Sequence, residues 1–281
     1  MTDANTPADF ERRGQSVQHW LQDRFACDPV VMDQLDDDVL ILGWEKDGLV
    51  TAATFGLWHR QLPECVEYLC EVDAVAAGAA PIALRVCVER VLATQQALVA
   101  RDLWINDQPF LKGSRMWGLL VADDPDEQTA IRDSAGQIVG HARRILMLTR
   151  NEALAAGEHG TSILSANDPA YRDPDHADLV DLQLVPVPQV EVIASEYLAD
   201  NPVQLVLRRA DGEYLALSGV EQPGDSSRPE HFGLVPAADL VERNPGIRDF
   251  MLNGAAGEAV SLREGGWVIE PIDSLFSEDV D

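Results

Sequence analysis

Apolar positions between residues 39 and 101 form three short runs followed by one long helical pattern. The runs, residues 39–44, 49–58 and 65–72, are rich in β-branched and aromatic side chains, and turn residues or a proline loop separate them. This pattern predicts an antiparallel meander. From residue 81 to 101 apolar residues recur every three or four positions, which predicts an amphipathic helix with one face on the meander.

The flanking segments predict further elements of the same first domain. Apolar residues at helical spacing predict an N-terminal helix over residues 9–25, and apolar runs at 116–121 and 142–148 predict two more strands. Thr149 and Glu152 have the spacing of a capping box, so a helix is expected from about residue 151 to 160.

A second domain follows a stretch that has little apolar periodicity. We expect an interdomain linker at residues 167–184, and a small domain over 185–281. In that domain Asp211 and Gly212 separate two apolar runs, which indicates a hairpin; a helix is expected at 236–243 and another hairpin around Gly265 and Gly266. The predicted class is α+β, with antiparallel sheets packed with helices in two domains, 1–166 and 185–281.

Charge narrows the partners that such a protein can bind. The 281 residues contain 21 Lys and Arg against 48 Asp and Glu, a net charge of −27, so nucleic acid and anionic membrane surfaces are unfavourable ligands. One interpretation is simple solubility or salt adaptation; the other is a surface that captures a basic partner. For the second, the candidate partner-binding residues are the acidic clusters of two loops: Asp36, Asp37, Asp38, Asp123, Asp124, Asp126 and Glu127.

The N-terminal sequence and the cysteines bear on location. The first residues lack a basic region followed by an apolar core, and no apolar run approaches the roughly 20 residues of a membrane helix, so a cytoplasmic protein is expected. The four cysteines have no paired metal-site spacing and are expected to be thiols.

No motif predicts catalytic, cofactor-binding or metal-binding residues. A pair between His59 and Cys65 is conceivable, but Cys65 begins an apolar strand, where a buried thiol is inert. Glu67 and Glu71 share one strand face and would suit acid and base chemistry; the favoured interpretation is the solvent face of an edge strand.

Several segments together resemble the Suppressor of Fused domain family over residues 30–166. They are the strand at 49–57, the helix from Pro81, the strand at 116–120, the run at 145–154, and Gly157 and Gly160 ahead of Ile163. Bacterial members of that family resemble immunity proteins, which are non-enzymatic cytoplasmic proteins that bind and neutralise a cognate polymorphic toxin.

The resemblance implies an immunity protein without cofactors whose partner is a toxin, expected to be basic. A hydrolase or transferase with a site at the domain junction, built from His59, Cys65 or Glu67, is the alternative. A general protein-interaction scaffold is a third hypothesis. The sequence does not identify the toxin or the family of the second domain.

Overall fold

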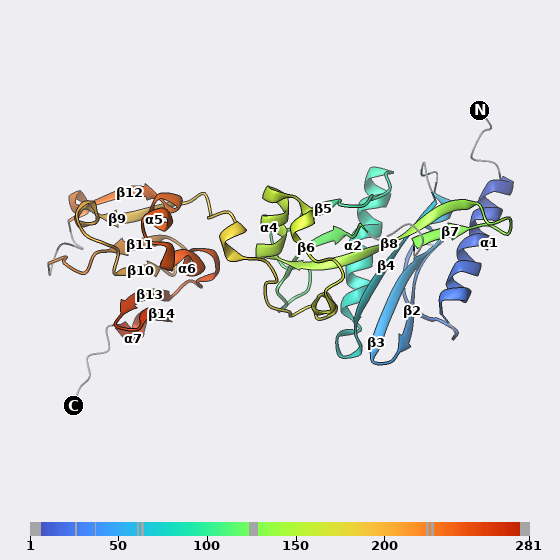
Figure 1. The fold of residues 1–281 in the computed structure, drawn as a ribbon, viewed down its shortest axis with the longest axis horizontal. Coiled ribbons are helices and arrows are strands. Elements are labelled where there is room, and N and C mark those ends of the chain that lie inside the picture. The colour runs from blue at the N-terminus through green and yellow to red at the C-terminus, as the bar shows by residue number, and fades with distance from the viewer. Residues whose placement is uncertain are drawn as a thin grey trace. The chain divides into compact units, whose positions relative to one another are not determined.

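Two units, Met1–Leu184 and Val185–Asp281, make up the chain, and each contains its own sheet (Figure 1). The computed structural model describes residues 7–25, 27–36, 38–60, 62, 65–123, 129–222, 225 and 228–275. Both sheets pack against helices, so the α+β class is confirmed.

Eight strands in the described part of the first unit form one sheet, in the order β1-β2-β3-β4-β8-β6-β5 with β7 beside β8. The elements are α1 (Pro7–Arg24), β1 (Val30–Asp36), β2 (Val39–Lys46), β3 (Leu49–Phe55), β4 (Cys65–Asp73), α2 (Ala79–Thr94), β5 (Leu103–Ile105), β6 (Met116–Val121), β7 (Ala130–Arg132), β8 (Ile138–Thr149) and α4 (Arg150–His159).

The predicted meander is present as β2, β3 and β4, which pair antiparallel in sequence order. Asp47 and Gly48 both have positive φ, 54° and 78°, in the two-residue turn between β2 and β3, as a primed hairpin turn requires. Two features were not predicted: β1 pairs outside β2, and β8 pairs parallel to β4. The sheet is therefore mixed, and β4 lies in its interior.

Both faces of this sheet carry helices because side chains alternate along each strand. Val66 and Tyr68 of β4 lie in the core beneath α2, whereas Cys65 and Leu69 lie in the core beneath α1. Figure 1 shows α1 and α2 on either side of the meander strands. Farther along the α1 face, α4 covers the ends of β6 and β8 through a third buried cluster.

Helix α2 ends earlier than its apolar pattern indicated. Gln95 adopts a left-handed conformation, with φ 55°, and its N–H donates to the carbonyl of Val91. That geometry closes the helix at Thr94. The following residues then turn back to the sheet, where Leu98 exchanges hydrogen bonds with the Tyr68 hydroxyl.

The segment 167–184, expected to be an interdomain linker, belongs to the first unit. Tyr171 is 3% exposed and belongs to the cluster beneath α4, and His176 is 5% exposed. The apolar pattern did not predict this packing, because the segment is held by a few buried side chains on irregular backbone. Such side chains show no periodicity in the sequence.

The second unit contains a six-stranded sheet among its described residues, in the order β12-β9-β11-β10-β13-β14. The hairpin around Asp211 and Gly212 is confirmed, as is the hairpin around Gly265 and Gly266. Its elements are β9 (Glu191–Ser195), β10 (Leu205–Arg208), β11 (Tyr214–Leu217), β12 (Phe232–Pro236), α5 (Ala237–Arg243), α6 (Arg248–Asn253), β13 (Glu258–Arg263), β14 (Gly266–Pro271) and α7 (Ile272–Leu275). The core lies between the sheet and helices α5 and α6.

Candidate binding site

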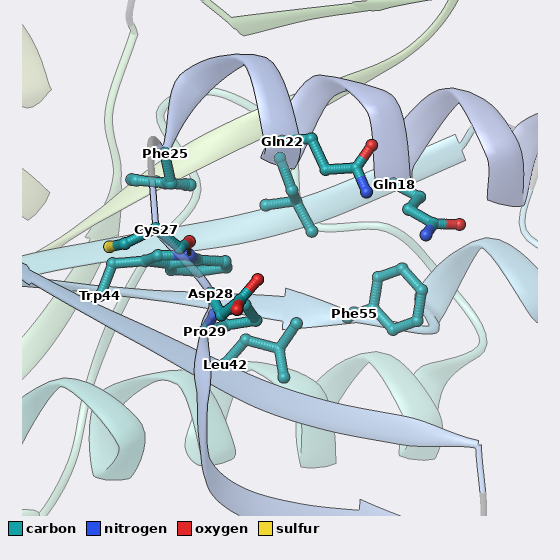
Figure 2. Close-up of a pocket in the computed structure, with 10 residues that line it drawn as sticks. Gln18, Gln22, Phe25, Cys27, Asp28, Pro29, Leu42, Trp44 and Phe55 are labelled. Carbon is teal, nitrogen blue, oxygen red and sulfur yellow. Dashed lines mark hydrogen bonds between the residues drawn. The ribbon is translucent and has the colours of Figure 1, made fainter.

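A pocket of about 540 Å³ opens between α1 and the strands β2 and β3 of the first unit (Figure 2). Helix α1 contributes its C-terminal turns, the segment before β1 contributes one rim, and the two strands form the floor. The lining residues are Gln18, Leu21, Gln22, Phe25, Cys27, Asp28, Pro29, Leu42, Trp44 and Phe55. Its volume lies within the range of about 300–1,000 Å³ that is typical of ligand pockets.

The amphipathic pattern of α1 explains one wall. Val17 and Leu21 are buried against the sheet, while the neighbouring Gln18 and Gln22 remain exposed beside the pocket. Residues three and four apart share a helix face, so the apolar pair anchors the helix and the glutamines line its flank.

An aromatic stack fixes one end of the pocket. The rings of Phe25 and Trp44 lie 4.1 Å apart at an interplanar angle of 13°. Trp44 Nε1–H also donates to the carbonyl of Cys27 at 3.1 Å. These contacts tie the segment after α1 to β2, and Phe55 lies away from the stack at the other end of the view in Figure 2.

Asp28 is the only charged residue among the ten that line the pocket in the described structure, and it is exposed. A cation already lies beside one of the lining rings. The Arg24 guanidinium is 6.0 Å from the ring centroid of Phe25, and 5.5 Å from that of Trp20, which does not line the pocket. Chemically, the pocket combines aromatic walls, two amide groups and one carboxylate.

The predicted acidic clusters are only partly visible. Asp38 is exposed in the turn between β1 and β2, and Asp123 is exposed after β6. Asp36 is the last residue of β1, and the structure describes its backbone only. The residues Asp37, Asp124, Asp126 and Glu127 lie outside the described residues.

Asp38 and Asp123 are not brought together. Four strand spacings separate β2 from β6, which is roughly 19 Å of sheet. Asp123 moreover accepts hydrogen bonds from Arg101, with Nη2 at 2.5 Å. Among the described residues, Asp38 and Asp123 therefore do not form one continuous acidic site.

Glu67 is not on a solvent face, as was expected, but is fully buried. The prediction was wrong on two counts: β8 pairs with β4 and makes it an interior strand, and the turn after β3, with Gly56 and Trp58, covers the face of β4 that carries Glu67. The Glu67 carboxyl accepts hydrogen bonds from Thr54 Oγ1 at 2.5 Å and from the N–H groups of Gly56 and Trp58 at 3.1 and 3.3 Å. Burial raises its pKa to about 7 despite these bonds, which lower it.

The groups named for a Cys-His or carboxylate site have other surroundings. Cys65 is 1% exposed in the core beneath α1, whereas His59 is exposed and stacks on Trp58 with ring centroids 3.4 Å apart. Glu67 organises the turn after β3. None of the three lines the pocket between α1 and the strands.

A second buried polar cluster escaped the sequence reasoning. The confirmed capping box joins Thr149 and Glu152, and Glu152 also accepts from His176 Nε2 at 3.1 Å and from the N–H of Leu179 at 2.9 Å. His176 Nδ1 lies 2.7 Å from the carbonyl of Asp173. Both imidazole nitrogens therefore face acceptors, which favours the protonated ring.

The pKa of His176 follows from these contacts. Burial lowers it, but the hydrogen bond and charge of Glu152 and the carbonyl of Asp173 raise it more, so the net pKa is raised. The Glu152 carboxylate thereby holds residues 173–179 against the start of α4. A capping-box glutamate was readable from the sequence; its histidine partner, 24 residues away, was not.

Two features are absent from the described residues. No helix there has the length and apolar character to cross a membrane. Nor do three or more His, Cys, Asp or Glu side chains gather there in a group that could hold a metal ion.

Comparison with known proteins adds no family to this picture. No protein-family model matches the chain, and no curated protein matches its sequence.

Proposed function

We propose that this chain is a non-enzymatic binding protein that captures and neutralises a basic protein, as immunity proteins neutralise toxins. The net charge of −27 is the observation that carries the proposal. Because Lys and Arg number 21 and Asp and Glu 48, the negative charge of the chain is not balanced by its own basic residues. The resemblance to bacterial Suppressor of Fused domains suggests the toxin as the partner and the cytoplasm as the location.

The roles of the buried polar groups support binding over catalysis. Glu67 satisfies the donors of one turn, and Glu152 and His176 attach one segment to α4. Each is less than 6% exposed, so a substrate would have to displace structural hydrogen bonds to reach it. The accessible pocket instead presents apolar rings, amides and a single carboxylate.

Electrostatics gives the proposed capture a kinetic advantage. A chain with this charge attracts a cationic protein over distances of about one Debye length, roughly 8–10 Å at physiological salt. Such steering raises association rates far more than it slows dissociation. For a protein that must intercept a toxin before it acts, fast association is the useful property.

Co-expression with the product of the adjacent reading frame tests the proposal. If that product arrests growth of a bacterial host, this chain should restore growth and bind the purified product, with an association rate that falls steeply between 50 and 500 mM salt. Absence of both binding and rescue would count against the neutralising role. Rescue by a variant with residues 36–38 and 123–127 neutralised to Asn and Gln, at an unchanged association rate, would refute electrostatic capture through those loops.

A further inference from the structure

We infer that the pocket between α1 and the strands β2 and β3 receives a basic side chain, with arginine preferred, from the partner protein. The inference deepens the proposed function, because it assigns a specific contact to a basic partner. It rests on the chemistry of the pocket lining, and its test does not require the partner to be known.

The aromatic lining suits a flat cation. Phe25, Trp44 and Phe55 present π systems in or beside the cavity, and a guanidinium near such rings gains cation–π attraction. The Arg24 guanidinium lies 6.0 Å from the ring centroid of Phe25, so one aromatic ring of the lining already has a cation beside it in the folded chain. Arginine stacks on aromatic rings better than lysine because its charged group is planar and more weakly hydrated.

The polar part of the lining selects positive charge. Asp28 supplies a carboxylate at the exposed rim, and the side-chain carbonyls of Gln18 and Gln22 can accept N–H donors. No Lys, Arg or His occurs among the ten described lining residues. A cation entering the pocket therefore meets acceptors in the lining, in a chain whose net charge is −27, and a like charge beside the lining is the Arg24 guanidinium, 6.0 Å from the Phe25 ring centroid.

The pocket is open to solvent and not a closed cavity, so a side chain carried by another protein can enter it. A second copy of this chain is the less favourable source, since two molecules of charge −27 repel each other. An anionic ligand would meet the same repulsion at Asp28.

Cys27 provides a reporter inside the pocket. It is exposed, whereas Cys65, Cys70 and Cys87 are buried, so a thiol reagent reacts with one known position in the native protein. Iodoacetamide is suitable because it is uncharged; because it reacts with the thiolate, whose fraction depends on nearby charge, each variant is compared with its own rate in the absence of competitor. The rate of Cys27 alkylation is measured by mass spectrometry against increasing N-acetyl-arginine amide, with the matching citrulline amide as a neutral, nearly isosteric competitor.

We expect the arginine amide to slow the alkylation of Cys27, and the citrulline amide to do so only at concentrations several-fold higher. D28N should raise the arginine concentration needed for half protection by about two- to fivefold, the range of an exposed ion pair. D23N removes the same charge from α1 at a residue that does not line the pocket, and it should leave protection unchanged. W44L should weaken protection by at least as much as D28N, with near-ultraviolet circular dichroism to establish that it is folded.

Equal protection by arginine and citrulline amides, or an equal effect of D28N and D23N, would overturn the inference. So would protection by N-acetyl-norleucine amide at the same concentrations, since the pocket would then select an apolar chain. The outcomes separate the two proposals. If D28N and W44L neutralise a toxin as well as the native chain does, the pocket assignment fails and the proposed function stands. If the arginine amide protects Cys27 but no basic protein binds the chain, the pocket assignment stands and the proposed function fails.

Discussion

Replacement of Glu67 by Gln is expected to change how stability depends on pH. The Glu67 carboxyl is fully buried, and burial raises its pKa from the ordinary 4.5 to about 7. A raised carboxyl pKa stabilises the folded state below the unfolded pKa of 4.5, and that contribution is lost as the pH rises through about 7. Gln has nearly the same shape and no titration, so it lacks this dependence.

The magnitude follows from the pKa difference between the folded and unfolded states. A difference of about 2.5 units corresponds to about 3 kcal/mol between the low-pH and high-pH limits. Between pH 5.5 and 8.5, where acid precipitation near the isoelectric point is avoided, the same two pKa values give a loss of about 2 kcal/mol. The free energy of unfolding of E67Q, relative to that of the native chain, should therefore rise by about 2 kcal/mol over this interval.

Hydrogen bonds constrain the choice of substitution. Glu67 Oε1 accepts from the N–H groups of Gly56 and Trp58, and the Gln carbonyl can retain both. Thr54 Oγ1, which donates to Oε2, can accept from the new amide instead. E67A leaves three buried donors without an acceptor, each costing about 1–3 kcal/mol, and it is expected to be severely destabilised at every pH.

Urea unfolding monitored by tryptophan fluorescence is the appropriate assay. Five of the six tryptophans, Trp20, Trp44, Trp58, Trp104 and Trp117, lie in the first unit, so the signal reports mainly on the part that contains Glu67. Other titrating groups contribute equally to both proteins, and the difference between the two pH profiles removes them. A difference that stays constant from pH 5.5 to 8.5 would mean that hydrogen bonding offsets burial and that the carboxyl titrates normally, which would refute the reasoning.

Three further expectations follow. G56A should lower the free energy of unfolding by more than about 3 kcal/mol, because φ at Gly56 is 121° and a Cβ there would meet a backbone carbonyl oxygen at 1.8 Å. G48A, where φ is 78° and the space is open, should lower it by about 1 kcal/mol. Similar losses for the two variants in urea unfolding would contradict this expectation. Because the pKa of His176 is raised in the folded state, its contact with Glu152 stabilises the fold fully below about pH 6.5, and this contribution is lost as the pH rises through the folded pKa. Amide hydrogen exchange in residues 173–179, corrected for its intrinsic pH dependence, should therefore accelerate over that pH range. The acceleration should be absent in H176Q. T149A removes the cap of α4 and should lower the free energy of unfolding by about 1–2 kcal/mol, and a loss below about 0.3 kcal/mol would argue that the capping box contributes little.

Local signals in the sequence predicted the elements whose causes are local. The turn at Asp47 and Gly48, the capping box at Thr149 and the hairpin at Asp211 each depend on residues within a few positions of one another. Periodicity likewise predicted α1 and the three meander strands. These features need no knowledge of what packs against them.

Long-range pairing could not be predicted, and it decides the surroundings of the polar groups. The alternation of β4 placed Glu67 on one face, but whether that face is solvated depends on α1 and the turn after β3, which pack on it, and β4 is an interior strand only because β8 pairs with it from 75 residues downstream. His176 reaches Glu152 in the same way, across a segment with no periodic pattern. A charged residue in a strand was interpreted as a solvated one, while the fold instead supplied donors for a buried carboxyl.

The acidic runs and the pocket place their carboxylates in different surroundings. Asp38, in the first of these runs, is exposed to water, where a carboxylate interacts weakly and salt screens it. Asp28 stands alone in the sequence, yet the fold places it beside aromatic rings and two amides, where a bound cation would lose water and gain several contacts at once. Clustered charge in a sequence therefore indicates steering, whereas specific recognition depends on isolated charges that the fold sets beside apolar surface. In the proposed division of labour, the acidic loops accelerate encounter with a basic partner, and the pocket between α1 and the strands β2 and β3 selects it.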